Sequence, residues 1–184
     1  MYKVYPKIIL ACLLLVMTGT VYSQRVTQTI NDGWKFSLFE GDASTADFDI
    51  SGWTDVSIPH TWNAKDADDE IPGYFRGKGW YRKVVAVEEL IPEQRVYLSF
   101  EGANQETNVF VNGTFVGNHK GGYSAFTFDV TDYVHAGRNL IAVSVDNSHN
   151  PDIAPLSADF TFFGGIYRDV YLVYTSPVQL STTH

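Results

Sequence analysis

The segment from Ala158 to Val170 combines residue types that could bind a ligand. A single acid, Asp159, stands in a run of aromatic residues that ends in two glycines, Gly164 and Gly165. Aromatic faces pack against the C–H groups of a sugar ring, and a carboxylate accepts hydrogen bonds from paired hydroxyls. Glycine lets a backbone turn sharply or approach another group closely. The segment therefore predicts a sugar-binding loop, and the alternative is that Asp159 is a buried or strand-capping acid.

The common catalytic and cofactor signatures are absent from the sequence. There is no Gly-x-Ser-x-Gly elbow, no His-Glu-x-x-His pair, no cysteine pair and no phosphate-binding glycine motif. The acidic run Asp66–Glu70 could attract calcium, but it lacks the glycine of an EF-hand loop and is interpreted as a solvated loop. We therefore expect no cofactor and no metal. Glycoside hydrolysis needs two carboxylates, and nothing singles out a pair among the 21 acids.

The net charge narrows the classes of partner. The 184 residues carry a formal net charge of −8. Nucleic acids and anionic membranes both favour basic surfaces, so neither is an expected partner. An aromatic content of 15% is consistent with a carbohydrate ligand instead.

The first 23 residues are typical of a secretory signal peptide. Lys3 and Lys7 precede the apolar run Ile8–Met17, which is too short to span a bilayer. We expect cleavage between Ser23 and Gln24, a secreted or periplasmic protein, and no membrane attachment after cleavage; an uncleaved N-terminal anchor is the alternative. Cys12 is the only cysteine and lies in this leader, so the mature chain would have no disulfide.

The rest of the chain has the pattern of an all-β protein. Short alternating, β-branched and aromatic runs are separated by turn residues, with Asn112-Gly113 as the clearest hairpin signal. We expect a jelly-roll β-sandwich over residues 24–175, followed at 176–184 by a linker and the start of another domain. A short helix is expected at Thr131–Val134, ended by Gly137, and another helical turn at Ser44–Asp49. The expected strands are Val26–Ile30, Lys35–Leu38, Val56–Ile58, Trp80–Val87, Val96–Glu101, Asn108–Val111, Phe115–Gly117, Ala125–Val130, Leu140–Asp146 and Val170–Tyr174.

Six segments, in order, resemble one known family. They are residues 31–36, 53–62, 77–83, 109–117, 121–126 and 164–170, with signatures such as Gly-Trp-Tyr-Arg-Lys and Gly-Gly-Ile-Tyr-Arg-Asp-Val. Together they are similar to the N-terminal sugar-binding domain of glycoside hydrolase family 2, which includes β-galactosidases, β-glucuronidases and β-mannosidases. The resemblance covers Thr27 to about Tyr174.

The resemblance implies a jelly-roll domain followed by an immunoglobulin-like domain and a TIM barrel. In the family the barrel carries the two glutamates of a retaining mechanism. The Asn-Glu dipeptide that marks the acid/base residue does not occur in this sequence. The expectation is therefore a first domain without catalytic residues of its own, whose partners are the domains that follow and a β-linked sugar, either a galactoside or a glucuronide.

The resemblance also implies site residues. An aspartate seven residues before the isoleucine of the closing motif binds sugar hydroxyls in β-galactosidases and β-glucuronidases, and Asp159 stands seven before Ile166. Family members place further active-site contacts in the loop that here contains Asn63 and Tyr74, so both are candidate substrate-binding residues. Arg168 matches an arginine that we expect to be structural.

Three interpretations follow from the sequence. The first is a sugar-binding domain of a retaining, β-galactosidase-like glycosidase, in which this domain shapes the substrate pocket. The second is a stand-alone carbohydrate-binding module without catalysis. The third is a truncated product without activity.

Overall fold

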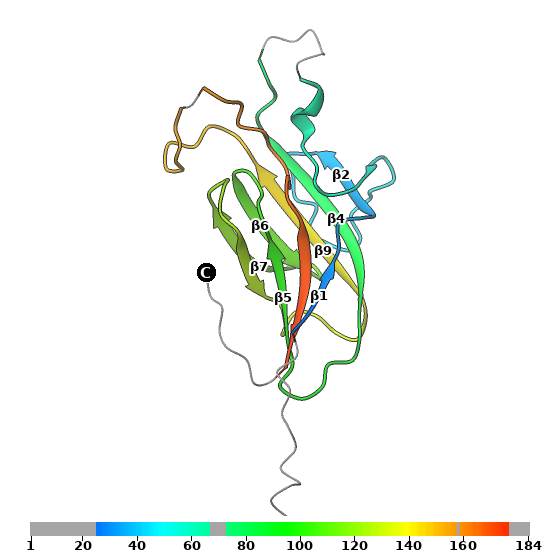
Figure 1. Ribbon diagram of the computed structural model, residues 1–184. Helices are drawn as coiled ribbons and strands as arrows, with labels where there is room; N and C mark the ends of the chain where they lie inside the picture. Colours follow the sequence, from blue (N-terminus) through cyan, green and yellow to red (C-terminus); the bar gives the residue numbers. More distant parts are fainter. Residues whose placement is uncertain (1–24, 67–72, 158, 177–184) are drawn as a thin grey trace, which may run out of the picture.

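Two antiparallel sheets, packed face to face, make up a computed structural model that describes residues 25–66, 73–157 and 159–176 (Figure 1). The four-stranded sheet has the order β1-β10-β5-β8 and the six-stranded sheet the order β3-β2-β4-β9-β6-β7. The strands are β1 (Arg25–Thr29), β2 (Trp34–Leu38), β3 (Thr54–Val56), β4 (Lys78–Val87), β5 (Arg95–Phe100), β6 (Glu106–Val111), β7 (Thr114–Lys120), β8 (Phe126–Asp129), β9 (Gly137–Asp146) and β10 (Val170–Thr175). The expected all-β sandwich is confirmed, and each of the ten expected strands overlaps an observed one.

The long loops and the two terminal strand ends lie at opposite ends of the sandwich. β1 pairs with β10 along its whole length, so Arg25 lies opposite Thr175. The loop before β4 and the loop between β9 and β10 both lie at the upper end in Figure 1, whereas β1 begins and β10 ends at the lower end. The β6–β7 hairpin turns at Asn112 and Gly113, which both have positive φ (52° and 82°), as a type I′ turn requires.

Alternation along the strands builds the core between the sheets. Val96, Leu98 and Phe100 of β5 are fully buried, and they face the sheet that contains Ile141, Val143 and Val145 of β9. Each such side chain stabilises the fold by about 1.5–3 kcal/mol relative to exposure. Trp34 is also fully buried, and its Nε1 donates to the carbonyl of Ile30 at 2.7 Å. The polar atom of this large side chain is thereby satisfied.

A second, smaller cluster covers part of the outer face of the six-stranded sheet. Trp80 on β4 and Ala142 on β9 pack there with Ala43 from the connection between β2 and β3. Trp80 Nε1 donates to the carbonyl of Gly41 at 3.0 Å, and Arg82 Nη1 donates to the carbonyl of Ala43 at 3.0 Å. The connection is therefore fixed across the outside of the sheet.

The two expected helical segments are turns in the structure. The prediction at residues 131–134 is wrong because the Thr131 hydroxyl, instead of capping a helix, accepts a hydrogen bond from the backbone N–H of Val96 on β5 at 2.9 Å. The segment Ser44–Asp49 forms a single turn, in which Phe48 N donates to Thr45 O at 3.4 Å. The one 3₁₀ helix of the described residues is η1 (Trp62–Lys65), which the sequence pattern did not predict.

Some expectations fall outside the described residues. They include the leader at 1–23, residues 177–184 and most of the acidic run, since only Asp66 of that run is described. Within the described ranges, no helix has the length and apolar character needed to cross a membrane.

His60, which lies just before η1, is expected to make the stability of the domain depend on pH. His60 Nδ1 lies 2.8 Å from the Tyr81 hydroxyl, whose pKa is raised far above its ordinary value by burial, so the tyrosine stays protonated. Burial also lowers the pKa of His60 below 6.5. The unfolded chain therefore binds a proton at a higher pH than the folded chain does.

We expect the free energy of unfolding to decrease as the pH falls from about 6.5 through the folded pKa of His60. Urea denaturation of the wild type between pH 7.5 and pH 4.5 measures this decrease. His60→Gln should flatten that part of the curve, and His135→Gln, at an exposed position, should leave it unchanged. A His60→Gln curve as steep as the wild type would contradict the assignment.

Candidate functional site

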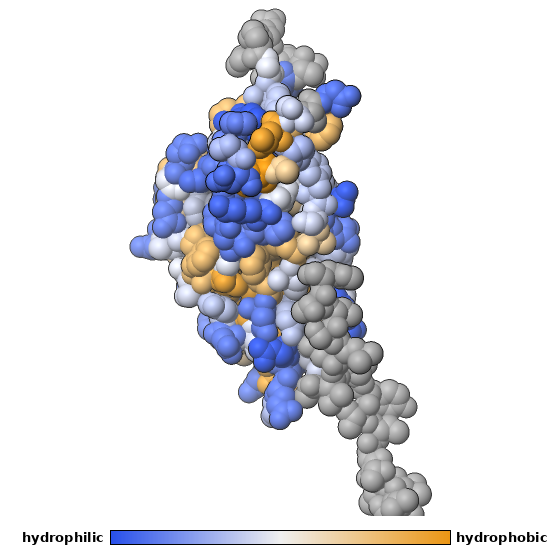
Figure 2. Space-filling model, turned by 90° about the vertical axis from the view of Figure 1, so that its left-hand side faces the viewer, coloured by the Kyte–Doolittle hydropathy of each residue, from blue (hydrophilic) through white to orange (hydrophobic). Residues whose placement is uncertain are grey.

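Asp159 lies at an exposed, aromatic tip of the long loop between β9 and β10. Phe160, the next residue, is 51% exposed, and its ring meets that of Tyr123 edge-on at a centroid distance of 6.1 Å. Phe162 lies below, 5.4 Å from Phe160. Figure 2, which faces the side of the molecule that carries β7, shows apolar surface near this end among hydrophilic residues. Asp159 is thus exposed and directly precedes an exposed ring of this aromatic group, and its role in sugar binding stays a prediction.

Tyr74 belongs to the same group of aromatic residues. Its hydroxyl accepts a hydrogen bond from the backbone N–H of Phe162 at 3.4 Å. The guanidinium of Arg76 lies over both rings, 5.3 Å from Phe162 and 5.9 Å from Tyr74. Burial is the main cause of the raised pKa of Tyr123, with smaller effects from Tyr167 and Tyr74. Tyr74 therefore borders the loop that carries Asp159, and its role in binding stays a prediction.

Asn63 has a buried position and a full set of structural contacts. Its side chain is 2% exposed, and its Nδ2 donates to the carbonyl of Phe75 and to a carboxylate oxygen of Asp66, both at 2.7 Å. Its Oδ1 accepts from the backbone N–H of Gly164 at 2.6 Å. Asn63 thus joins the loop before β4 to the loop before β10. A direct contact with substrate stays a prediction that these hydrogen bonds do not require.

Two further asparagines hold the loop, and the sequence pattern did not single them out. Asn147 is 0% exposed; its Nδ2 donates to the carbonyl of Phe162 at 2.9 Å, and its Oδ1 accepts from Gly77 N at 2.8 Å. Asn104 Nδ2 donates to the carbonyl of Phe163 at 2.8 Å. Their positions directly after β9 and before β6 were the only signal in the sequence. Buried amides thus fix the aromatic loop from three directions.

The two glycines allow the loop to pass close to the core. A Cβ at Gly164 would stand 2.0 Å from the ring of Trp62, and a Cβ at Gly165 would stand 2.5 Å from the carbonyl oxygen of His60. Gly165 also has a φ of +119°. The close approach that the Gly-Gly pair predicts is therefore confirmed. Arg168 is exposed and lies 5.5 Å from the ring of Tyr167, and its structural role stays a prediction.

The described part of the site presents hydrogen-bond acceptors and aromatic surface. In the residues that the structure describes, no three histidine, cysteine or acidic side chains come together in a way that could hold a metal ion. The arrangement can accept hydrogen bonds and stack on an apolar ring face, as ligand recognition requires.

A jelly-roll sandwich that carries a carboxylate and exposed aromatic rings on an end loop defines a class of protein, the carbohydrate-recognising β-sandwich domains. The family model described as "Glycosyl hydrolases family 2, sugar binding domain" matches residues 27–177. The chain belongs to this family, as its six motifs indicate.

Individual relatives agree with this assignment. The chain is 37% identical to a putative beta-glucuronidase of Formosa agariphila over 91% of its own length, and 40% identical to a beta-galactosidase of Thermoanaerobacter pseudethanolicus over 80%. Among solved structures, a Bacteroides uniformis beta-glucuronidase is 46% identical over 82% of this chain, with a TM-score of 0.76.

These relatives are much longer than the chain. The chain covers 21% of the Formosa protein, 19% of the Thermoanaerobacter protein and 18% of the Bacteroides structure. It thus spans about a fifth of the length of the curated relatives that it matches.

Proposed function

We propose that this domain contributes sugar contacts to a retaining β-glycosidase that acts on a β-galactoside or β-glucuronide. The domain works as part of a longer polypeptide whose other domains carry the reacting carboxylates. The observation that carries this proposal is that Asp159 is exposed and directly precedes Phe160, whose ring contacts that of Tyr123, on a loop whose base is fixed by buried amides. Relatives in the same family are named as beta-glucuronidases and beta-galactosidases, which supports this class of substrate.

The contribution of the loop is positioning. A carboxylate that accepts two hydroxyl hydrogen bonds fixes the rotation of a sugar ring, and the aromatic faces fix its plane. Holding the glycosidic bond in a reactive geometry lowers the barrier for the catalytic groups of another domain. The buried amides of Asn63, Asn104 and Asn147 keep the loop in one conformation before the sugar arrives, so little ordering entropy opposes binding.

Asp159→Ala should lower kcat/KM on aryl β-glycosides about ten- to a hundredfold in the full-length polypeptide, because a charged hydrogen bond contributes about 1.5–3 kcal/mol. The domain should unfold at the same temperature as the wild type, since Asp159 is exposed. Steady-state kinetics and a thermal melt measure the two effects.

Asp132→Ala is the matched control, because Asp132 is also an exposed loop aspartate. It should change neither the kinetics nor the melting temperature. Unchanged kcat/KM for Asp159→Ala on every aryl β-glycoside would refute the proposed role. Saturable micromolar binding of a galactoside by the domain alone would instead favour the stand-alone module.

We also propose that the protein is exported through its N-terminal leader. The basic and apolar segments of residues 1–23 support this proposal. Intact-mass analysis of the secreted protein from the native host should give an N-terminus at Gln24. An N-terminus at Met1 in the cell-free fraction would contradict cleavage.

A further inference from the structure

A polar pocket of about 150 Å³ lies where β6 begins and β9 ends, on the outer side of the six-stranded sheet. None of its residues belongs to the aromatic tip, although the loop that begins after β9 contributes to both. The lining consists mainly of amide, carboxylate, hydroxyl and imidazole side chains: Gln105, Glu106, Asp146, Ser148, His149, Asn150 and Pro151.

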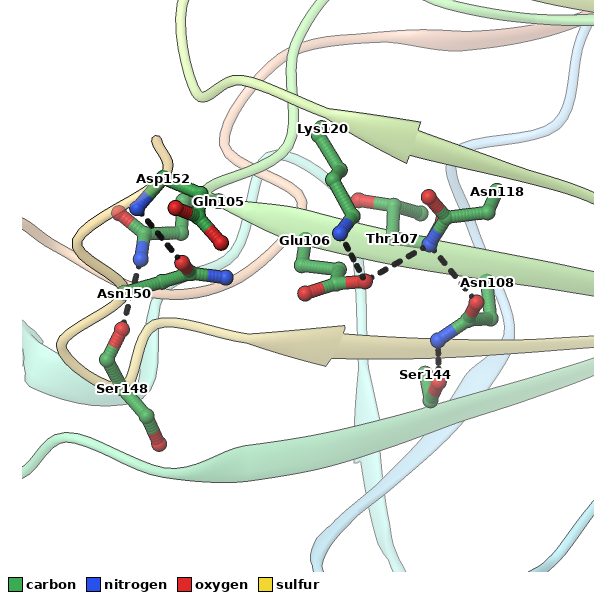
Figure 3. Close-up of polar contacts among 10 residues, drawn as sticks. All are labelled: Gln105, Glu106, Thr107, Asn108, Asn118, Lys120, Ser144, Ser148, Asn150 and Asp152. Atoms are coloured by element: carbon green, nitrogen blue, oxygen red, sulfur yellow. Dashed lines mark hydrogen bonds and ion pairs between the residues drawn. The ribbon is translucent and has the colours of Figure 1, made fainter. Parts of the chain in front are cut away.

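Internal hydrogen bonds fix the wall of this pocket (Figure 3). Gln105 is 5% exposed, and its Nε2 donates to the carbonyl of Ser148 at 2.6 Å. Ser148 N in turn donates to Asp146 Oδ1 at 2.8 Å, and Asp152 N donates to Asn150 Oδ1 at 2.9 Å. The segment after β9 is therefore held in place by its own hydrogen bonds, which keep the pocket wall in one conformation.

A row of polar side chains continues from the pocket along the strands. Asn118 Nδ2 donates to Glu106 Oε1 at 3.1 Å and to Asn108 Oδ1 at 2.9 Å, while Asn108 Nδ2 donates to Ser144 Oγ at 3.3 Å. Figure 3 shows these side chains projecting from β6, β7 and β9 on the same side of the sheet. The Asn118 amide thereby restricts the orientation of the Glu106 carboxylate.

Two like charges face each other at the pocket. Glu106 and Asp146 are direct cross-strand partners, a placement that destabilises an antiparallel pair. Lys120 Nζ lies 3.7 Å from Glu106 Oε1 and offsets one of the two charges. Hydroxyl groups that donate to both carboxylates would stabilise the pair further, whereas a third carboxylate would add repulsion.

We propose that this pocket is a second carbohydrate subsite, selective for one neutral hexose unit. Its volume is below the range of pockets that hold drug-sized ligands, about 300–1,000 Å³, and suits a single ring. The Asn150 amide nitrogen and the His149 imidazole supply hydrogen-bonding groups for ring hydroxyls, and the two carboxylates accept from vicinal hydroxyls. The negative charge disfavours uronic acids.

This inference rests on the proposed function only in taking the ligand to be a sugar of the same glycan. The Asp159 loop would hold the sugar unit next to the scissile bond, and the pocket would hold a more remote neutral unit. Substrates with a neutral branch or extension should therefore be bound better than simple glycosides.

Nuclear magnetic resonance titration of the ¹⁵N-labelled chain distinguishes the two sites. Methyl β-galactopyranoside, added up to about 50 mM because isolated subsites bind in the millimolar range, should shift the amides of Gln105, Glu106 and Ser148. Methyl β-glucuronide should leave these amides unchanged. The isosteric variants Asp146→Asn and Glu106→Gln should each weaken galactoside binding about tenfold, by loss of a charged hydrogen bond.

The spectrum of each variant shows directly whether that variant is folded. Asp132→Ala is the binding control, and it should bind the galactoside as the wild type does. Galactoside shifts at the pocket but not at Gly164 would support this subsite while failing to support the proposed function. Shifts at Gly164 alone would overturn the subsite and leave the proposed function standing. Equal pocket shifts with the glucuronide would overturn the neutral selectivity, and no shifts with either sugar would overturn the subsite.

Discussion

Gly165→Ala should destabilise the domain by roughly 3 kcal/mol or more, because the new methyl group would meet fixed atoms and the backbone would be strained. The new Cβ would stand 2.5 Å from the carbonyl oxygen of His60 and 2.7 Å from the Tyr81 hydroxyl. Both neighbours are fixed, since His60 N donates to Ile166 O at 2.8 Å and Tyr81 is fully buried. The φ of +119° adds strain that an L-residue cannot relieve in place.

Gly137→Ala is the control that separates backbone strain from crowding. Gly137 also has a positive φ, +94°, but no atom lies within 4 Å of the position that the new methyl group would take. The substitution should cost about 1–2 kcal/mol, the strain contribution alone. Urea denaturation of both variants measures the difference. Equal losses of stability would show that the close approach to His60 contributes nothing.

Asn147→Ala should destabilise the domain by about 3 kcal/mol and loosen the aromatic loop. The change removes the donor to Phe162 O and the acceptor of Gly77 N, and it leaves two buried backbone groups unsatisfied at about 1–3 kcal/mol each. Equilibrium denaturation gives the loss of stability. Hydrogen exchange should show faster exchange at the amides of Gly77 and Gly164.

Two further variants test whether the expected loss of stability arises because the Asn147 amide is buried. Asn147→Asp keeps an acceptor for Gly77 N but places a buried carboxylate oxygen opposite the carbonyl of Phe162, so it should destabilise the domain at least as much as Asn147→Ala does. Asn118→Ala removes a more exposed amide that also makes several hydrogen bonds, and it should change stability by at most about 0.5 kcal/mol. A loss of similar size in Asn118→Ala and Asn147→Ala would argue against the role of burial.

The strands of this fold were predictable from sequence because their signals are local. Alternation in Val96–Phe100 and the Asn112-Gly113 turn depend on neighbouring residues and on the period of a strand. The expected helix at Thr131 failed for a non-local reason, since its hydroxyl binds β5, which lies 35 residues earlier in the chain. Helix capping and strand bridging use the same atom, and only the tertiary fold decides between them.

The candidate site also contains features that local sequence predicts and features that only the tertiary fold reveals. The close approach at Gly164 and Gly165 was predictable, because a Gly-Gly pair permits it, whereas the role of Asp159 in binding stays a prediction. The roles of Asn63 and Asn147 were not predictable, because an asparagine that holds a loop and one that binds a ligand have the same sequence signature. Their burial, at 2% and 0% exposure, distinguishes them only in the folded chain. Likewise, the pairing of β6 with β9 brings Gln105 and Glu106 together with Asp146 and residues 148–151 in the polar pocket.

The pairing of Arg25 with Thr175 has a consequence for engineering. The first described strand begins, and the last one ends, at the end of the sandwich opposite the aromatic loop (Figure 1). A short designed peptide could therefore join these two positions, and new termini could be opened in the β6–β7 turn at Gly113. Such a circular permutant would keep every strand pairing of the sandwich, and the end that carries the aromatic loop would lie away from both the new peptide and the new termini.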